Sequence, residues 1–254
     1  MLFAMDVGNT SITLGVFDNE KLTSSFSIET KKNSDTEYFT LSLVKKLTEN
    51  NLDPSLINSV IISSVVPELR EILAKSVKDI FGVKPLEVSH SSKTNMPILY
   101  DFPEEVGADR IVNAVAAFNI FNSSAIVVDF GTATTFDCIS AGGEYLGGAI
   151  APGIKISSDA LTLSASKLPG VNIEKPDNII GKNTVESMQA GIFYGYVSLV
   201  DGLILRIKES MQTDPAVIST GGFSKIISEE SKLIQHSDEF LTLKGLQILF
   251  KING

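Results

Sequence analysis

The sequence is poor in the side chains that build disulfides and ordinary zinc sites. It has one cysteine, Cys138, and two histidines, His90 and His236, which stand far apart in the chain. One cysteine excludes an internal disulfide framework, and one thiol with two distant imidazoles does not make a zinc site of the usual type. We therefore expect Cys138 to be a small buried residue of a strand.

Basic segments and membrane-length apolar segments are also missing. Lysine and arginine total 21 against 30 acidic residues, which gives a net charge of −9, and no basic run with interleaved aromatics offsets it. No apolar stretch reaches the length of about 18 to 20 residues that a membrane helix needs, and the first five residues lack the basic flank of a signal peptide. We predict a cytoplasmic protein with no nucleic-acid or membrane partner, in which any phosphate site is built locally.

Several familiar catalytic motifs are absent. No G-x-G-x-x-G follows a strand, which argues against a dinucleotide fold, and no G-x-S-x-G elbow supports a hydrolase triad. The run from Gly181 to Thr184 resembles the tail of a P-loop, but Asn183 separates Lys182 from Thr184, and Pro176 stands where the first glycine belongs. We therefore do not expect a dinucleotide fold, a P-loop or a hydrolase triad in this chain.

The segment that organises the chain is a polar corner between two apolar runs, which we call the first corner (residues 6–13). It contains one acid, one glycine and several hydroxyl or amide side chains, in the order Asp6, Val7, Gly8, Asn9, Thr10, Ser11, Ile12, Thr13. Glycine lets the backbone approach a ligand, and successive N–H groups with Asn or Thr side chains can hold an anion. An acid beside a phosphate requires a cation between them, so the corner is typical of a nucleotide phosphate site with a metal. An ordinary hairpin turn is the alternative.

The same pattern returns in the second half of the chain, which indicates an internal duplication. The first half predicts strands at 2–5, 12–17, 22–28 and 59–64, a helix introduced by a capping box at 34–37, and a helix from Pro67 to Gly82. The second half predicts strands at 125–129, 136–139, 144–150 and 216–220, a helix from Pro152 to Leu163, and a long helix with Thr184 as its N-cap. We expect two α/β domains, 1–115 and 116–254, each with the order β-β-β-α-β-α.

The second corner (residues 129–135) begins with Asp129, Phe130, Gly131 and Thr132, which matches the first corner. Two such corners in equivalent positions are expected to face each other across a cleft between the domains, where ligands bind preferentially. The alternative interpretation, an ordinary hairpin turn, would have to account for both corners at once.

Three other features each allow two interpretations. Asp109 and Arg110 follow Gly107 and Ala108 at a predicted helix start; they indicate either a base with an anion-binding arginine or a surface ion pair. Gly221 and Gly222 suit either an adenine contact or a turn that needs glycine. The stripe Gly191, Gly195, Ser198, Gly202 on one helix face suits either packing on the core or a homodimer interface.

These residues together resemble the type III pantothenate kinase family over essentially the whole chain. The matching segments, in order, are the first corner, Tyr100, 107–110, the second corner, 147–153, Thr184 and 220–222. The run Gly-Ala-Asp-Arg together with Asp-x-Gly-Thr-Ala-Thr is the discriminating pair.

The resemblance implies two ribonuclease H-like domains, as in actin and the sugar and acetate kinases, and transfer of phosphate from ATP to the primary hydroxyl of pantothenate, which begins coenzyme A synthesis. It implies that residues 6–13 and Thr132 bind ATP, that Asp6 holds Mg²⁺ with ATP, and that Asp129 holds a monovalent cation, K⁺ or NH₄⁺. Asp109 would accept the proton of the hydroxyl. The substrate would be bound by Tyr100, Gly107, Ala108, Asp109, Arg110 and, from the partner subunit of a homodimer, Thr184.

The physical chemistry of the site agrees with these implied roles. Phosphoryl transfer needs mainly alignment and charge neutralisation rather than a strong nucleophile. Two alternatives stay open at this point. One is a non-catalytic regulatory relative that acts as an accessory factor for transcription, which the intact acids at 6, 109 and 129 disfavour. The other is a kinase of the same superfamily that acts on another small hydroxylated acid.

Overall fold

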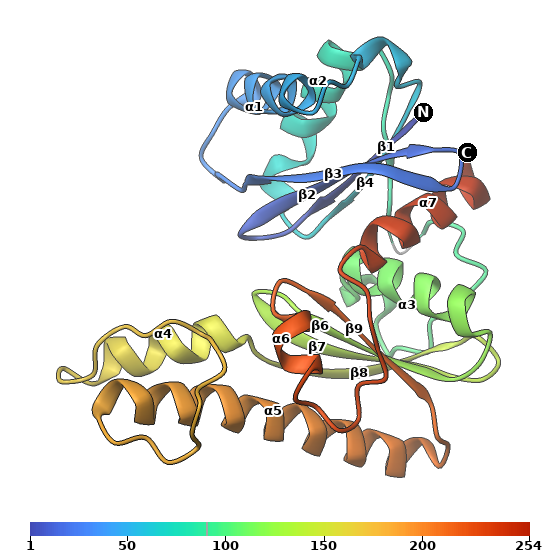
Figure 1. Cartoon of the computed structure of the whole chain (residues 1–254). Helices are drawn as coiled ribbons and strands as arrows, with labels where there is room; N and C mark the ends of the chain where they lie inside the picture. The colour runs from blue at the N-terminus through green and yellow to red at the C-terminus, as the bar shows by residue number, and fades with distance from the viewer. Residues whose placement is uncertain (90) are drawn as a thin grey trace. The chain divides into compact units, whose positions relative to one another are not determined.

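The computed structural model describes residues 1–89 and 91–254, so His90, named above in the zinc argument, lies outside the described residues. The chain divides into two compact units, Met1–Ala116 together with Leu241–Gly254, and Ala117–Phe240. Each unit is built on its own mixed five-stranded sheet with helices (Figure 1).

The sheet of the first unit has the order β3-β2-β1-β4-β5. Its strands are β1 (Leu2–Val7), β2 (Ser11–Asp18), β3 (Lys21–Glu29), β4 (Ser59–Ser64) and β5 (Leu86–Glu87). β1 is antiparallel to β2 and parallel to β4, and β2 is antiparallel to β3. β1 lies in the centre because almost all of its side chains are apolar and buried. The predicted opening meander is confirmed.

Helices cover both faces of this sheet. α1 (Thr36–Glu49) and α2 (Arg70–Phe81) lie together on one face, and α7 (Leu241–Asn253) lies on the other (Figure 1). Short 3₁₀ turns are found at Pro54–Leu56, Pro67–Leu69 and Pro103–Glu105. The predicted capping box is one residue off: Asp35, not Ser34, caps α1, because its side chain accepts a hydrogen bond from the Tyr38 N–H at 2.9 Å.

The second unit repeats the strand order of the first. Its sheet, β10-β9-β6-β7-β8, consists of β6 (Ala125–Phe130), β7 (Ala133–Ile139), β8 (Tyr145–Pro152), β9 (Ala216–Gly221) and β10 (His236–Ser237). β6 is antiparallel to β7 and parallel to β9, as β1 is to β2 and β4. This shared topology confirms the predicted duplication. Cys138 is buried in β7, as predicted.

The helices of the second unit are α4 (Ile154–Ser164), α5 (Thr184–Met211) and α6 (Ser224–Ser228), and α3 (Ala108–Phe121) runs across the sequence boundary of the two units. The predicted element order lacked β5 and β10, because two-residue strands carry no readable periodicity. Thr184 is the first residue of α5 and not its N-cap; Asn183 caps the helix by accepting a hydrogen bond from the Glu186 N–H at 3.0 Å.

The C-terminal helix corrects the predicted domain division. We assigned 116–254 to the second domain, but α7 belongs to the first unit. Two close approaches explain this assignment: a methyl group at Gly245 would lie 2.2 Å from the Val112 carbonyl oxygen, and one at Gly15 would lie 2.9 Å from the Leu243 side chain. α7 therefore completes the core that β2 and α3 begin.

α5 is an exception to the expectation that no apolar segment reaches the length of a membrane helix. Among the described residues it is long and apolar enough to cross a membrane, with 33% of its most apolar window buried. A core helix of a soluble protein passes the same test, so length and composition alone are weak evidence for a membrane span.

Candidate functional site

The first corner is a tight hairpin connection at the end of β1 and β2. The two strands are paired up to Val7 and Ile12, and the Gly8 N–H donates to the Ser11 carbonyl at 3.0 Å. A methyl group at Gly8 would lie 3.1 Å from that same oxygen, which leaves little room for a side chain. Asn9 and Thr10 form the exposed tip.

Two residues that the sequence analysis did not select hold this corner in place. Thr30 donates its hydroxyl to the Gly8 carbonyl at 2.7 Å and its N–H to the Thr10 carbonyl at 3.0 Å. The Lys32 ammonium donates to Asn9 Oδ1 at 2.7 Å. Both residues reach the corner because β3 pairs with β2 in a register that sets Glu29 opposite Ser11. The predicted meander was the sequence signal that could have identified Thr30 and Lys32, because its third strand ends beside the corner.

Asp6 lies between two hydroxyl residues in the sheet. Its register partners are Thr13 on β2 and Ser63 on β4. Paired residues of neighbouring strands point to the same face, so all three side chains share one face of the sheet. Carboxylate and hydroxyl oxygens are the donors that Mg²⁺ prefers, and this set fits such an ion with water and phosphate completing its shell.

The second corner has the same plan. Asp129 has Thr135 on β7 and Thr220 on β9 as register partners. Gly221, with φ of 89°, lies so close to this acid that a methyl group there would be 2.6 Å from Asp129 Oδ1 and 2.7 Å from the Phe130 carbonyl oxygen. A close turn therefore requires Gly221. Carboxylate, carbonyl and hydroxyl oxygens around Asp129 fit a monovalent cation.

Thr132 is fixed by the glycine that precedes α4. A methyl group at Gly153 would lie 2.3 Å from the Thr132 carbonyl oxygen and 2.8 Å from that of Gly131. The second corner and the N-terminus of α4 are therefore in direct backbone contact.

Asp109 stands in the first turn of α3 with its carboxylate half-buried. Its Oδ1 accepts a hydrogen bond from the Arg110 N–H at 2.8 Å, and a methyl group at Gly107 would lie 2.5 Å from the same oxygen. Burial raises the pKa of the Asp109 carboxyl above its usual value, and this outweighs the opposing effects of the Arg110 N–H and guanidinium. Arg110 is only 7% exposed, so the interpretation as a surface ion pair is wrong.

Val65 connects Asp109 with the first corner. Its N–H donates to the Val7 carbonyl at 3.1 Å, and its side chain lies 3.6 Å from the position of a methyl group at Gly107. Asp6 and the start of α3 are therefore at the same end of the sheet in the first unit.

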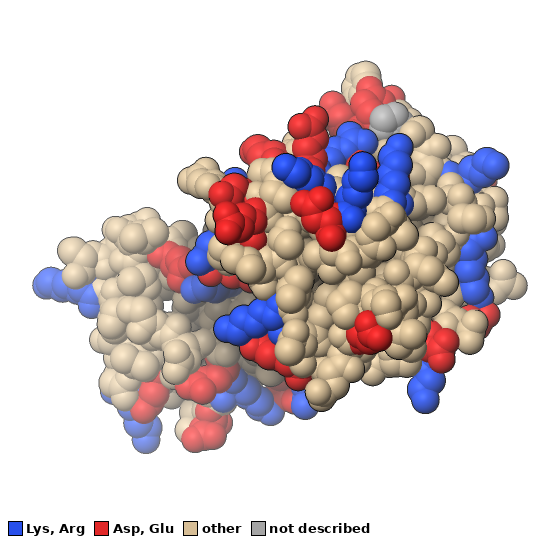
Figure 2. All heavy atoms as spheres, turned by 90° about the horizontal axis from the view of Figure 1, so that it is seen from above, with Lys and Arg blue, Asp and Glu red and all other residues tan. Residues whose placement is uncertain are grey.

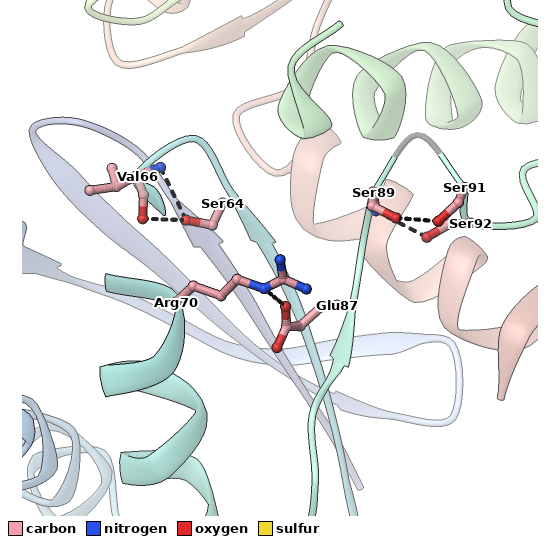
Figure 3. Close-up of polar contacts among 7 residues, drawn as sticks. All are labelled: Ser64, Val66, Arg70, Glu87, Ser89, Ser91 and Ser92. Atoms are coloured by element: carbon pink, nitrogen blue, oxygen red, sulfur yellow. Dashed lines mark hydrogen bonds and ion pairs between the residues drawn. The ribbon is translucent and has the colours of Figure 1, made fainter. Parts of the chain in front are cut away.

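A cavity of about 350 Å³ lies in the first unit beside this connection. Its lining combines apolar residues with charged side chains, and it includes Val65, Gly107 and Ala108 as well as Arg70 and Glu87. Figure 3 shows two polar contacts at its edge: Ser64 turns back onto Val66, at 3.2 Å from the carbonyl oxygen, and Arg70 is paired with Glu87. Two of the predicted substrate residues thus border this cavity.

A larger cavity, about 660 Å³, lies between α4 and α5 in the second unit. Its walls are mainly apolar, with Thr184, Ser157, Ser187 and Tyr196 contributing hydroxyls. The Tyr196 hydroxyl is hydrogen-bonded to the Thr134 hydroxyl and donates to the Pro152 carbonyl at 3.0 Å, and so ties α5 to β7 and β8.

The glycine stripe of α5 is open. Methyl groups at Gly191, Gly195 and Gly202 would meet no described atom within 4 Å, so the stripe does not serve helix packing in this chain. Apolar side chains nearby are exposed, including Val185, Leu199 and Leu205. Of the two interpretations of the stripe, packing on the core is therefore wrong.

The predicted site residues are divided between the units. The first unit contains 6–13, Tyr100 and 107–110; the second contains Asp129, Thr132 and Thr184. In the part of the chain that the structure describes, no three His, Cys, Asp or Glu side chains gather into a metal site. A cation at Asp6 or Asp129 thus depends on hydroxyl, carbonyl, water or phosphate oxygens for its other ligands.

Charged side chains of both signs are found on the surface. Figure 2 shows that basic and acidic side chains are interspersed over the face in view.

Comparison with known proteins places the chain in a family. The family model described as type III pantothenate kinase matches residues 2–206. The type III pantothenate kinase of Geotalea uraniireducens is 51% identical over 253 residues, covering 100% of this chain and 99% of the relative, and that of Geobacter sulfurreducens is 50% identical with the same coverage.

Solved structures show the same fold at low identity. A putative Baf family transcriptional activator from Campylobacter jejuni superposes with a TM-score of 0.63 at 19% identity, covering 99% of this chain and 98% of that one. A putative N-acetylglucosamine kinase from Porphyromonas gingivalis gives a TM-score of 0.52 at 13% identity, with 100% and 99% covered. The predicted two-domain α/β fold class is confirmed, and the family model with these close full-length relatives shows that the chain belongs to the type III pantothenate kinase family.

Proposed function

We infer that this chain is an ATP-dependent pantothenate kinase that phosphorylates pantothenate to 4′-phosphopantothenate, the first step of coenzyme A biosynthesis. The family model over residues 2–206, together with the full-length relative at 51% identity, carries this inference. The acids at both corners and at the start of α3 are intact, as an active phosphotransferase with an alcohol acceptor requires.

Asp109 is proposed as the proton acceptor for the pantothenate hydroxyl. Burial raises its pKa, which makes its ionised form a stronger base than an exposed aspartate. The hydrogen bond from the Arg110 N–H and the close approach of Gly107 fix the direction of the carboxylate. The buried Arg110 supplies a fixed positive charge for the substrate's carboxylate.

The first corner is proposed to bind the ATP phosphates, with Thr132 of the second corner as a further contact. Thr30 and Lys32 hold the tight turn at Gly8 in shape, and Lys32 adds a positive charge to an otherwise acidic protein. Asp6 would hold Mg²⁺ with the nucleotide. The ion, when bound, would neutralise the charge of the phosphates. The residues of the first corner would align the reacting groups.

Asp129 is proposed to hold a monovalent cation, K⁺ or NH₄⁺. Asp129 Oδ1 and the Phe130 carbonyl oxygen both lie next to Gly221, and they would provide oxygens for such an ion.

We further propose a homodimer in which α5 forms the interface. The open glycine stripe and exposed apolar side chains on α5 support it, because contiguous apolar surface marks interaction sites. Thr184, at the start of α5 and on the wall of the larger cavity, would then contact the substrate bound by the partner subunit, together with Tyr100, Gly107, Ala108, Asp109 and Arg110. The enzyme would act in the cytoplasm, without nucleic-acid or membrane partners.

The direct test measures ATP-dependent phosphorylation of pantothenate with and without K⁺. Turnover that depends on pantothenate and rises with K⁺ or NH₄⁺ supports the proposal. No turnover by folded protein under any of these conditions would contradict it. A panel of other small hydroxylated acids, compared by kcat/KM, separates pantothenate from other acceptors.

A further inference from the structure

A buried hydroxyl beside the first corner lacks a hydrogen-bond partner. Ser63, the penultimate residue of β4, is 0% exposed, and its Oγ contacts no donor or acceptor among the described residues. Burying a hydroxyl without a partner is unfavourable. Such atoms are rare in native proteins, and each calls for an explanation such as a bound ligand or an ordered water.

The register of the sheet sets this hydroxyl beside Asp6. β1 and β4 are parallel neighbours, and Asp6 is paired with Ser63; strands in such a pair lie about 4.8 Å apart. Met5, Val7 and Ile62 belong to the core cluster that includes α1 and α2. Because side chains alternate along a strand, Asp6 and Ser63 both point to the opposite face.

The second unit repeats this pairing. There Asp129 is paired with Thr220 on the parallel strand β9, and Thr220 is 1% exposed. The duplicated strands β4 and β9 thus carry a buried hydroxyl at the equivalent position, beside the acid of each corner. Its recurrence in both copies indicates that the hydroxyl serves the acid and not the packing of one unit.

We propose that Ser63 is a positioning residue for the divalent cation of the nucleotide: its hydroxyl oxygen accepts a hydrogen bond from a water molecule in the hydration shell of the cation held at Asp6. This rests on the proposed role of Asp6. The Asp6 side chain is one bond longer than the Ser63 side chain. A cation bound at the Asp6 carboxylate therefore lies too far from Ser63 Oγ for direct contact, and a water molecule bridges the two. Mg²⁺ keeps several of its waters when it binds to protein, and hydrogen bonds to such outer groups tune affinity.

The test uses Mn²⁺ as a spectroscopic probe on the full-length protein. The affinity of Mn²⁺ for the complex with a non-hydrolysable imido analogue of ATP is measured by electron paramagnetic resonance. Ser63→Ala is expected to weaken Mn²⁺ binding about 10-fold and to raise KM for MgATP more than it lowers kcat. The ligand-free thermal midpoint should stay unchanged or rise, because the variant removes an unpaired polar group. Ser63→Thr, which copies the second unit, should restore Mn²⁺ binding.

The matched control is Ser76→Ala on α2. Ser76 is equally buried, but its hydroxyl is already used by the carbonyls of Thr36 and Ile72, each at 3.1 Å. This control should lower the thermal midpoint and leave Mn²⁺ affinity unaltered.

Two outcomes would overturn the inference, and they differ in what else they reject. If Asp6→Asn loses Mn²⁺ but Ser63→Ala binds it within two-fold of the wild type, Ser63 has no part in cation binding and the proposed function stands. If Asp6→Asn also binds Mn²⁺ as the wild type does, the role of Asp6 and the inference on Ser63 both fail.

Discussion

Lys32 donates a hydrogen bond from its ammonium group to Asn9 Oδ1 at 2.7 Å, across 23 positions of the sequence. Lys31, its neighbour, is used differently: it lies 3.7 Å from Glu29 and over the ring of Tyr38. Two adjacent lysines thus differ in whether they touch the corner proposed to bind phosphate.

This difference gives a matched pair of variants. Lys32→Met should raise KM for ATP several-fold with a smaller effect on kcat, because an exposed charge contributes about 0.2–1 kcal/mol directly and more where it orders a loop. Lys31→Met should leave KM for ATP nearly unchanged. Steady-state kinetics at two ionic strengths measures both. Equal effects of the two substitutions would reject a specific role for Lys32.

Asp109→Asn should lower kcat by about 10²- to 10⁴-fold, the usual contribution of a positioned base. Asparagine keeps an oxygen that can accept the Arg110 N–H, so the local geometry should be retained. KM for ATP and the circular dichroism spectrum serve as controls. A variant with wild-type turnover would remove Asp109 from the proposed role.

The raised pKa of Asp109 also predicts a pH dependence of stability. A carboxyl whose pKa is raised by folding stabilises the folded state below its unfolded pKa of about 3.9, and this contribution is lost as the pH rises through the folded value. Asp109→Asn does not ionise, so at pH 7 its thermal midpoint should equal or exceed that of the wild type. The difference in thermal midpoint between Asp109→Asn and the wild type should vanish below about pH 4. A variant that is less stable only at neutral pH would show that the charged form is favoured by folding.

The acid limb of kcat/KM against pH should have its midpoint above the ordinary aspartate value, for the same reason. The profile is to be recorded with pantothenate limiting and ATP saturating. An acid limb at or below the usual aspartate pKa would contradict a desolvated base.

Gly221 and Gly222 form a pair that differs in available space. A methyl group at Gly221 would press on Asp129 Oδ1 at 2.6 Å in a backbone with φ of 89°, whereas one at Gly222 meets nothing within 4 Å. Gly221→Ala should lower the free energy of unfolding by about 1–3 kcal/mol and raise the K⁺ concentration needed for half-maximal activity. Gly222→Ala should be nearly neutral in urea unfolding. Similar losses in both variants would mean that the turn, and not Asp129, demands glycine.

Leu199 tests the proposed interface on α5. It lines the larger cavity and is 37% exposed, so Leu199→Asp should dissociate a dimer that buries this face. Leu41→Asp on α1, where the leucine is 62% exposed, is the control. Sedimentation equilibrium reports the mass directly. A wild-type protein that is monomeric at micromolar concentration would reject the dimer itself.

The sequence was informative wherever the signal was local or periodic. Alternating and continuous apolar runs located β1, β4, β6 and β9, and the repeated Asp-x-Gly pattern located both corners. Cap residues were predicted one position away from those observed, because Ser34 and Asp35, or Asn183 and Thr184, are both good caps, and only the backbone conformation decides between them.

What the sequence could not supply depends on contacts between distant segments. Thr30 and Lys32 reach the first corner only through the pairing of β2 with β3. Ser63 comes to Asp6 through the parallel pairing of strands more than fifty positions apart. The glycine stripe of α5 could be assigned only when the neighbours of each glycine were known, since periodicity gives a face but not what covers it.

The placement of α7 has a consequence for the order in which the protein forms. Residues 117–240 are one uninterrupted stretch, whereas the first unit needs both 1–116 and 241–254. A chain made from its N-terminus can therefore complete the second unit before the first, whose α7 emerges last. Removing residues 241–254 should expose the face of β1 and β2 on which α7 packs. The second unit would keep all of its own residues.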